Sequence, residues 1–367
     1  MDFSSKYFPN GSAVDLWDSR PMSSARSAPI AALSFVTTIA MTELEEFSFV
    51  GLGLSKRVLA GRGAASTVQI GKTEKGKLVT VKLNHIESRS FTEFKDAAFE
   101  LHLSRMALEI RILAHREIRA NVNIVDVVGY AVYESAGLPA SFLVLEYAEY
   151  GDMRHFLRSH RDYSTRDCVK LCHGVANGLQ ALHRLKVCHG DVKLDNVLVF
   201  PDEVGKGWVA KIADLSHALV ANGDDTETKV APGFGTPLLN APEIRTGTAC
   251  NNEAFTIDDA LVTDTFSLGL LFWEALKKGD SFFDNCWHCA QMSDIHSLEN
   301  KEFFLNSLTQ NGLLHLGLDF LDDFSRLDIA MYSNIKKVFQ GALQDEPGRR
   351  MSIRELQKIL KNATQDE

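Results

Sequence analysis

Cysteine, positive charge and long apolar runs are all scarce in this chain. The 367 residues include only 6 cysteines, too few for a scaffold held together by disulfides. Lys and Arg number 39 against 48 Asp and Glu, a formal net charge of −9. This balance argues against electrostatic binding to nucleic acid, which depends on basic side chains near phosphates. Because no stretch reaches the roughly 20 apolar residues that span a bilayer, the sequence predicts no transmembrane segment.

The first 42 residues differ in composition from the rest of the chain. They are rich in serine, and Asp2, Asp15 and Asp18 precede an apolar stretch at 28–41. A secretory signal needs a short basic start instead. We therefore expect a poorly ordered lead-in at residues 1–42 and a cytoplasmic protein, with an organellar presequence as the weaker alternative because Arg20 and Arg26 lie among serines.

Apolar periodicity changes along the chain from strand-like to helix-like. Alternation from Lys77 to Leu83 and the short apolar run from Ser141 to Tyr147 predict two strands, and Phe91 to His115 has helical spacing. A strand-rich part followed by a helix-rich part predicts two lobes of an α+β fold, with a cleft between them as a ligand site. Later helices are predicted at Cys168–Leu185, Asp264–Lys277 and Ser352–Leu360.

The segment VCHGDVKLDNVLV, residues 187–199, is the most specific chemical signal. Two apolar runs flank its polar residues and would fix them rigidly. Asp191 can accept a proton, and Lys193 can neutralise a phosphoryl group during transfer. Asn196 can bind a metal ion through its amide oxygen. This pattern favours phosphoryl-transfer chemistry over a charged hairpin loop.

Three further signals are weak when taken alone. Gly61 and Gly63 lack a Cβ, so their backbone can approach a phosphate, but a hairpin turn also explains them. Lys82 lies in a predicted strand, where a solvated edge position is the common alternative. Asp214 follows an apolar strand and is either a metal ligand or the start of a turn.

Taken in order, these motifs resemble the eukaryotic protein kinases. The resemblance runs from about residue 55 to residue 361 and includes Gly235-Thr236-Pro237 and Ala241-Pro242-Glu243. It implies a bilobal kinase-like fold with a small β-rich N-lobe and a larger helical C-lobe. The implied divisions are a lead-in at 1–42, the N-lobe at 43–147, the C-lobe at 148–361 and a tail at 362–367.

The resemblance also implies an ATP site. Lys82 would hold the α- and β-phosphates and pair with a helical glutamate, either Glu109 or Glu100. Glu109 is preferred because Ile124 and Val125 follow it at the spacing typical of the family. The other implied nucleotide contacts are Gly61, Gly63 and Val68 over the nucleotide, backbone hydrogen bonds from Glu146 and Ala148, and Asp152 near the ribose.

The catalytic roles implied by the resemblance fall in the larger lobe. Asp191 would orient the substrate hydroxyl or accept its proton, and Lys193 would approach the γ-phosphate. Asn196 and Asp214 would coordinate Mg²⁺. Lys193 in this position, with Thr236 further on, is similar to the serine/threonine branch, so a protein Ser or Thr is the expected acceptor. The implied structural roles are an ion pair between Glu243 and Arg350, and support of the catalytic-loop backbone by Asp264.

Three positions depart from the family pattern. Gly190 replaces the usual arginine of the catalytic loop, so we expect no activation through a phosphate bound by that guanidinium. Ser216 replaces a glycine after Asp214, which would strain a backbone with positive φ. Ser66 stands where a third glycine is expected. The HGD-type loop at 188–193 is similar to kinase-like proteins of filamentous fungi.

The favoured function is transfer of the ATP γ-phosphoryl group to a protein hydroxyl, because Lys82, Asp191, Asn196 and Asp214 are all present. A pseudokinase scaffold with weak or no phosphotransfer is the alternative. A small-molecule phosphotransferase ranks third, since such enzymes usually lack the Ala241-Pro242-Glu243 segment.

Overall fold

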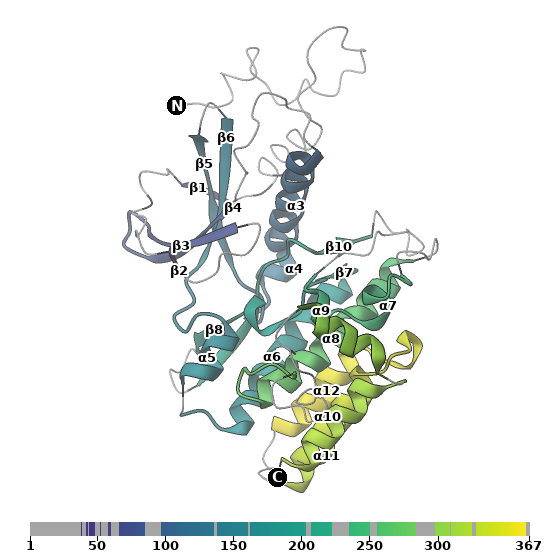
Figure 1. The fold of residues 1–367 in the computed structure, drawn as a ribbon. Helices are drawn as coiled ribbons and strands as arrows, with labels where there is room; N and C mark the ends of the chain where they lie inside the picture. Colours follow the sequence, from purple (N-terminus) through teal and green to yellow (C-terminus); the bar gives the residue numbers. More distant parts are fainter. Residues whose placement is uncertain are drawn as a thin grey trace.

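The structure is a computed structural model, and Figure 1 shows its fold. It describes residues 38, 42, 44–47, 52, 58–59, 66–84, 97–135, 138–160, 162–202, 207–221, 235–249, 255–283, 298–308, 310–324 and 328–364. Most of the predicted lead-in at 1–42 therefore lies outside the described residues.

A six-stranded sheet forms the smaller lobe, in the strand order β1-β5-β6-β4-β3-β2. β1 runs parallel to β5, and the other neighbours are antiparallel. Side chains on β4 alternate, so that Val79 and Val81 pack into an apolar cluster while Lys82 reaches the helix on the other face. The strands are β1 Glu45–Phe47, β2 Val58–Leu59, β3 Ser66–Lys72, β4 Leu78–Asn84, β5 Val127–Ser135 and β6 Leu138–Glu146.

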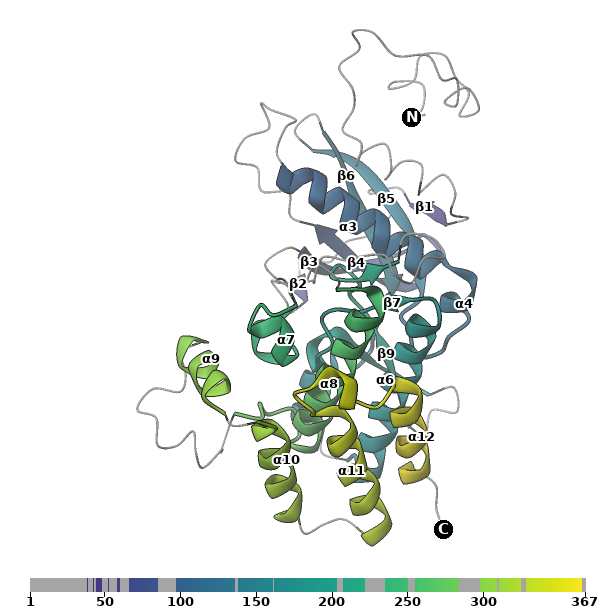
Figure 2. The ribbon, with the colours of Figure 1, turned by 90° about the vertical axis from the view of Figure 1, so that its right-hand side faces the viewer.

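One long helix, α3, spans Ala97–Ala114 and lies across β5 and β6 (Figure 2). Met106, Ile110 and Leu113 recur at helical spacing and are buried. The helix predicted from Phe91 to His115 is confirmed over this range, and residues 91–96 lie outside the described part. α3 therefore brings Glu109 to the face of the sheet on which Lys82 lies.

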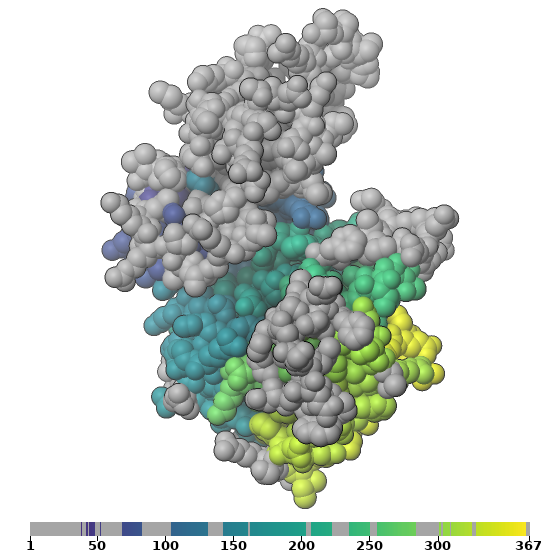
Figure 3. Space-filling view, in the orientation of Figure 1, coloured from purple at the N-terminus to yellow at the C-terminus, as the bar shows by residue number. Residues whose placement is uncertain are grey.

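The larger lobe is helical and lies below the sheet in Figure 1. In Figure 3 the space-filling surface of this lobe forms one body coloured from teal to yellow. Two antiparallel strand pairs, β7 with β10 and β8 with β9, flank the polar segment at residues 189–196. Together the two lobes form the predicted bilobal α+β fold. The remaining elements are α4 Arg116–Arg119, α5 Met153–Ser159, α6 Thr165–Arg184, β7 Val187–Cys188, β8 Val197–Pro201, β9 Trp208–Ile212, β10 Leu219–Val220, α7 Pro242–Arg245, α8 Ile257–Leu276, α9 Leu298–Ser307, α10 Gly312–Asp322, α11 Ile329–Ala342 and α12 Ile353–Thr364.

Two helices begin earlier than the apolar periodicity predicts, because a capping box starts each of them before its first apolar turns. α8 starts at Ile257 rather than at Asp264. Its capping box is formed by Thr256, whose side chain accepts the Asp259 N–H, and by the Asp259 carboxylate, which accepts the Thr256 N–H. α6 starts at Thr165 rather than at Cys168 behind a similar capping box. α8 is buried along most of its length, so it forms the rigid centre of the larger lobe.

No helix in the described part of the chain is both long enough and apolar enough to cross a membrane.

Candidate active site

Lys82 lies between two carboxylates at the junction of the lobes. Its Nζ atom is 2.8 Å from Glu109 Oε1 and 2.8 Å from Asp214 Oδ1. The side chains of Lys82 and Glu109 are only 7% and 4% exposed. β4 is an interior strand, so the solvated-edge alternative for Lys82 is wrong. Glu100 also lies in α3, but its side chain is outside the described part.

The charges in this trio stabilise one another. Burial lowers the pKa of Lys82, but Glu109 and Asp214 outweigh burial and bring the pKa above its usual value. Burial raises the pKa of Asp214, but the Lys82 ammonium holds that pKa well below its usual range. At neutral pH the ammonium and the Asp214 carboxylate are therefore both charged, as phosphate and metal binding require.

Asp191 lies in the loop after β7 and accepts hydrogen bonds on both carboxylate oxygens. Oδ1 accepts from the Thr236 N–H and from Thr236 Oγ1, each at 2.8 Å. Oδ2 accepts from Lys193 Nζ at 2.7 Å and from Asn196 Nδ2 at 2.9 Å. Burial raises the pKa of Asp191, but the bonds from Lys193 and Thr236 outweigh it and lower the pKa below its usual value. The carboxylate is thus ionised and held in one orientation.

The backbone before Asp191 is held from below by α8. Asp264, which is buried, accepts the N–H of His189 on Oδ2 at 2.7 Å and the N–H of Gly190 on Oδ1 at 2.9 Å. His183 Nε2 lies 2.9 Å from the same Oδ2 atom. The predicted support of the loop by Asp264 is therefore present.

Gly190 stands where the family pattern has an arginine, and the shape of the loop requires a glycine at this position. Its φ is +75°, in the left-handed region that favours glycine. A Cβ at this position would lie 2.5 Å from the backbone oxygen of His217. The loop and the segment after Asp214 therefore pack too closely for a side chain here.

The Asp214 segment is strained at a different residue from the one expected. Asp214 itself has φ +60°, whereas Ser216 is not among the described residues with positive φ. The expected strain at Ser216 is wrong for this structure, because the left-handed turn occurs two residues earlier. An aspartate tolerates this region better than most residues. The Leu215 N–H donates to Glu109 Oε1 at 3.3 Å, so the segment is also tied to α3.

The residues predicted to contact adenine and ribose follow one another between the end of β6 and the start of α5. Glu146 ends β6, and its side chain accepts from Lys211 Nζ at 2.7 and 2.9 Å. Ala148 follows in the connection after β6 and is itself buried. Asp152 caps α5 by accepting the His155 N–H at 2.8 Å, a structural use that the sequence did not indicate.

The predicted phosphate lid is described only in part. Val68 pairs with Lys82 across β3 and β4 and is partly exposed. Gly61 and Gly63 lie outside the described residues. Ser66 begins β3, and its side chain is outside the described part.

Asn196 and Asp214 suit a magnesium ion that is shared with phosphates. Asn196 donates through Nδ2 to Asp191, which leaves its Oδ1 oxygen without a hydrogen-bond donor among the described residues. The Asp214 side chain is 36% exposed and is bound by Lys82 through Oδ1. No group of three or more His, Cys, Asp or Glu side chains in the described part is placed to hold a metal ion alone. These donors therefore fit Mg²⁺, which usually binds one or two carboxylates and substrate phosphates.

Several contacts of the site were not predicted from the sequence. The Thr236 hydroxyl donates to Asp191 and accepts from Lys193 Nζ at 2.7 Å, whereas the sequence pattern indicated only a Gly-Thr-Pro motif. The Glu146–Lys211 pair and a network around Arg154 join residues far apart in the chain, and no local pattern signals them. The predicted Glu243–Arg350 pair is present, with two contacts of 2.7 Å.

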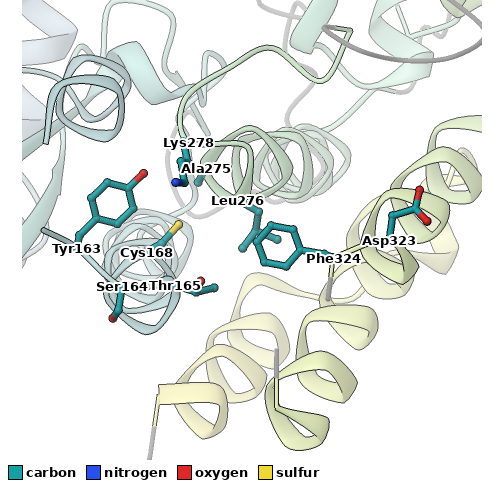
Figure 4. Close-up of a pocket in the computed structure, with 9 residues that line it drawn as sticks. All are labelled: Tyr163, Ser164, Thr165, Cys168, Ala275, Leu276, Lys278, Asp323 and Phe324. Atoms are coloured by element: carbon teal, nitrogen blue, oxygen red, sulfur yellow. The ribbon is translucent and has the colours of Figure 1, made fainter. Parts of the chain in front are cut away.

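A cavity elsewhere in the larger lobe shares no residue with this site. It lies between the start of α6, the end of α8 and the end of α10, and its volume is about 340 Å³ (Figure 4). In that view the Cys168 sulfur and the Lys278 amine point toward its interior, whereas Asp323 points away.

The protein kinase domain family matches residues 54–360. The chain belongs to the protein kinase family. It is 28% identical over 223 residues to a probable serine/threonine-protein kinase of Dictyostelium discoideum, and the matched segment covers 61% of this chain and 12% of that protein. It is 26% identical over 280 residues to a fibroblast growth factor receptor of Strongylocentrotus purpuratus, with 71% and 26% covered. It is 25% identical over 323 residues to cysteine-rich receptor-like protein kinase 18 of Arabidopsis thaliana, with 84% and 42% covered. The chain thus spans less than half the length of each of these relatives.

Proposed function

We propose that the chain is an ATP- and Mg²⁺-dependent protein serine/threonine kinase. The observation that carries this proposal is the assembled Lys82–Glu109–Asp214 trio beside the ionised Asp191, with Asn196 and Lys193 bonded to it. Positioning and electrostatic stabilisation supply most of the catalysis in phosphoryl transfer, and these side chains provide both.

In the proposed reaction the substrate hydroxyl oxygen bonds to the γ-phosphorus while the bond from that phosphorus to the bridging oxygen of ADP breaks. Asp191 orients the hydroxyl and receives its proton. Because the pKa of Asp191 is lowered, we expect the proton to move late, once the oxygen has largely bonded to phosphorus. Lys193 neutralises charge on the transferred group, and Lys82 holds the α- and β-phosphates. Mg²⁺ held by Asn196 and Asp214 would offset the phosphate charge.

The remaining contacts of the nucleotide belong to the same proposal. Glu146 and Ala148 bind the adenine through their backbone and Asp152 lies near the ribose. Gly61, Gly63 and Val68 cover the phosphates. We also propose that the lobes divide between residues 147 and 148, and that the smaller lobe begins near residue 43 and the larger ends near residue 361.

A protein Ser or Thr is the proposed acceptor. Lys193 donates hydrogen bonds to both Asp191 and Thr236. The family resemblance associates Lys193 and Thr236 at these positions with the serine/threonine branch. Relatives from Dictyostelium discoideum and Bifidobacterium longum are named probable serine/threonine-protein kinases. The similarity of the HGD-type loop to fungal kinase-like proteins and a cytoplasmic location stay predictions.

A scaffold without phosphotransfer is the second candidate function. The four donors already on the Asp191 carboxylate favour it, because an incoming hydroxyl has to displace one of them. Lys82 likewise occupies one oxygen of Asp214.

Labelled phosphate transfer separates the two candidates. The chain is incubated with γ-labelled ATP, Mg²⁺ and a mixed Ser/Thr peptide library, beside Asp191→Asn as the matched variant. We expect transfer by the natural chain that depends on Mg²⁺ and falls at least about a hundredfold in the variant. Equal label in both folded proteins, or none in either, would support the scaffold instead.

A further inference from the structure

Arg154, on α5, joins three elements around the end of the catalytic loop. Its Nε atom donates to Asp195 Oδ1 at 3.1 Å and Oδ2 at 3.0 Å, and Nη2 donates to Oδ2 at 3.0 Å. Nη2 also donates to Glu274 Oε2 at 2.8 Å on α8, and Nη1 donates to the Gly279 carbonyl at 2.9 Å. The planar guanidinium thus fits its partners as a rigid fork, which a lysine ammonium does not reproduce.

The carboxylate that Arg154 holds lies close in sequence to a proposed catalytic residue and a proposed magnesium ligand. Asp195 immediately precedes Asn196 and is two residues after Lys193. Its side chain is 48% exposed, and Arg154 is its hydrogen-bond partner among the described residues. Water therefore competes for this carboxylate, and the Arg154 fork is what fixes it in place.

The other end of the tether is rigid. Glu274 is only 3% exposed and lies in α8, the buried helix that also carries Asp264. Gly279 has φ +87°, and a Cβ there would lie 2.9 Å from the Arg154 backbone oxygen, so the turn packs closely on α5. A tether is useful for positioning only when its anchor does not move.

α8 therefore holds the catalytic loop at both ends. Asp264 binds the backbone of His189 and Gly190 before Asp191. Glu274 reaches Asp195 after Lys193 through Arg154. We propose that Arg154 is a positioning residue that fixes Lys193 and Asn196 relative to Asp191 by tying Asp195 to α8. This inference rests on the proposed kinase function, but the tether itself is measurable without nucleotide.

The variants must separate positioning from folding. Arg154→Met leaves the buried Glu274 carboxylate without its cation, which destabilises the fold for reasons unrelated to the loop. Asp195→Asn instead keeps the Arg154–Glu274–Gly279 contacts and weakens only the tether to the loop. Arg158→Met is the matched control, because Arg158 lies one turn further along α5 and pairs with Asp280 at the surface, at 3.4 Å.

Three measurements are made on the full chain: kcat and KM for ATP and peptide, the thermal midpoint, and amide hydrogen exchange of residues 190–198 without nucleotide. For Asp195→Asn we expect kcat to fall about tenfold with an unchanged midpoint, as displaced catalytic groups cost rate rather than stability. Exchange of the segment should be faster, and Arg158→Met should match the natural chain in all three.

The coupling between the two residues gives a second criterion. The double variant Arg154→Met with Asp195→Asn should lose no more activity than Arg154→Met alone, because both changes remove one interaction. Unchanged kcat and exchange in Asp195→Asn, or additive losses in the double variant, would overturn the proposal. If the natural chain transfers no phosphate, the kinase function fails, and hydrogen exchange alone decides whether Arg154 orders the loop.

Discussion

The replacement of Gly190 by alanine is the sharpest test of how the catalytic loop packs. Gly190 has φ +75° and lies against His217, whose backbone oxygen would be 2.5 Å from the new Cβ. Gly247 has nearly the same φ, +71°, but nothing lies within 4 Å of the position of its Cβ. The two glycines share the backbone strain and differ in the contact, so Gly247→Ala is a matched control.

The expected magnitudes follow from that difference. A Cβ in the left-handed region costs about 1–2 kcal/mol, and restricting the unfolded chain returns about 0.4–1 kcal/mol. Gly247→Ala should therefore lower the free energy of unfolding by about 1 kcal/mol. Overpacking against backbone adds about 1–3 kcal/mol, so Gly190→Ala should lower it by about 2–4 kcal/mol.

Urea unfolding followed by circular dichroism measures both changes, with the slope of the transition compared to check that it is unchanged. Gly190→Ala should also reduce kcat, because the residue immediately precedes Asp191, whereas Gly247→Ala should not. Equal losses of stability in the two variants would refute the packing argument, and they would show that the loop relaxes away from His217.

Three other expectations follow from individual contacts. Arg350→Met removes both 2.7 Å contacts to Glu243 within a buried pair and should lower the free energy of unfolding by about 3–5 kcal/mol in urea titrations, whereas a loss below 1 kcal/mol would contradict it. Thr236→Ala removes a hydroxyl bond to Asp191, so kcat should fall about tenfold or more while Thr236→Ser keeps most activity. Burial lowers the pKa of His173 below its ordinary 6.5, so as the pH falls the unfolded chain binds a proton at this residue before the folded chain does. The free energy of unfolding should therefore decrease below about pH 6.5, and this decrease should be shallower in His173→Gln; an identical slope would argue against the burial effect.

The sequence predicted those parts of the site that local patterns encode. The polar residues of the catalytic loop lie between two apolar runs, and this pattern correctly indicated a loop fixed at both ends. Alternation in β4 identified the strand that carries Lys82, but it did not show that the strand lies inside the sheet. Sheet order also depends on pairing with β6, which is distant in sequence, and not only on pairing with the preceding strand β3.

Side-chain contacts between distant elements could not be predicted in the same way. The Arg154 fork joins residues 41 and 120 positions apart, which meet only because α5 packs against the turn Leu194–Asn196 and Arg154 reaches Glu274 on α8. The predicted position of backbone strain was also wrong. The family pattern pointed to Ser216, whereas the residue with positive φ in the structure is Asp214. The early start of α8 was encoded locally by Thr256 and Asp259, so a capping-box search would have found it.

Magnesium-dependent nucleotide binding tests most directly whether Lys82, Asn196 and Asp214 form one site. Titration calorimetry with a non-hydrolysable ATP analogue, with and without Mg²⁺, compares the natural chain with Asp214→Asn. We predict tighter binding with Mg²⁺ in the natural chain and little or no gain from Mg²⁺ in the variant. Absence of binding by the folded natural chain, or an equal gain from Mg²⁺ in both proteins, would contradict the proposed site.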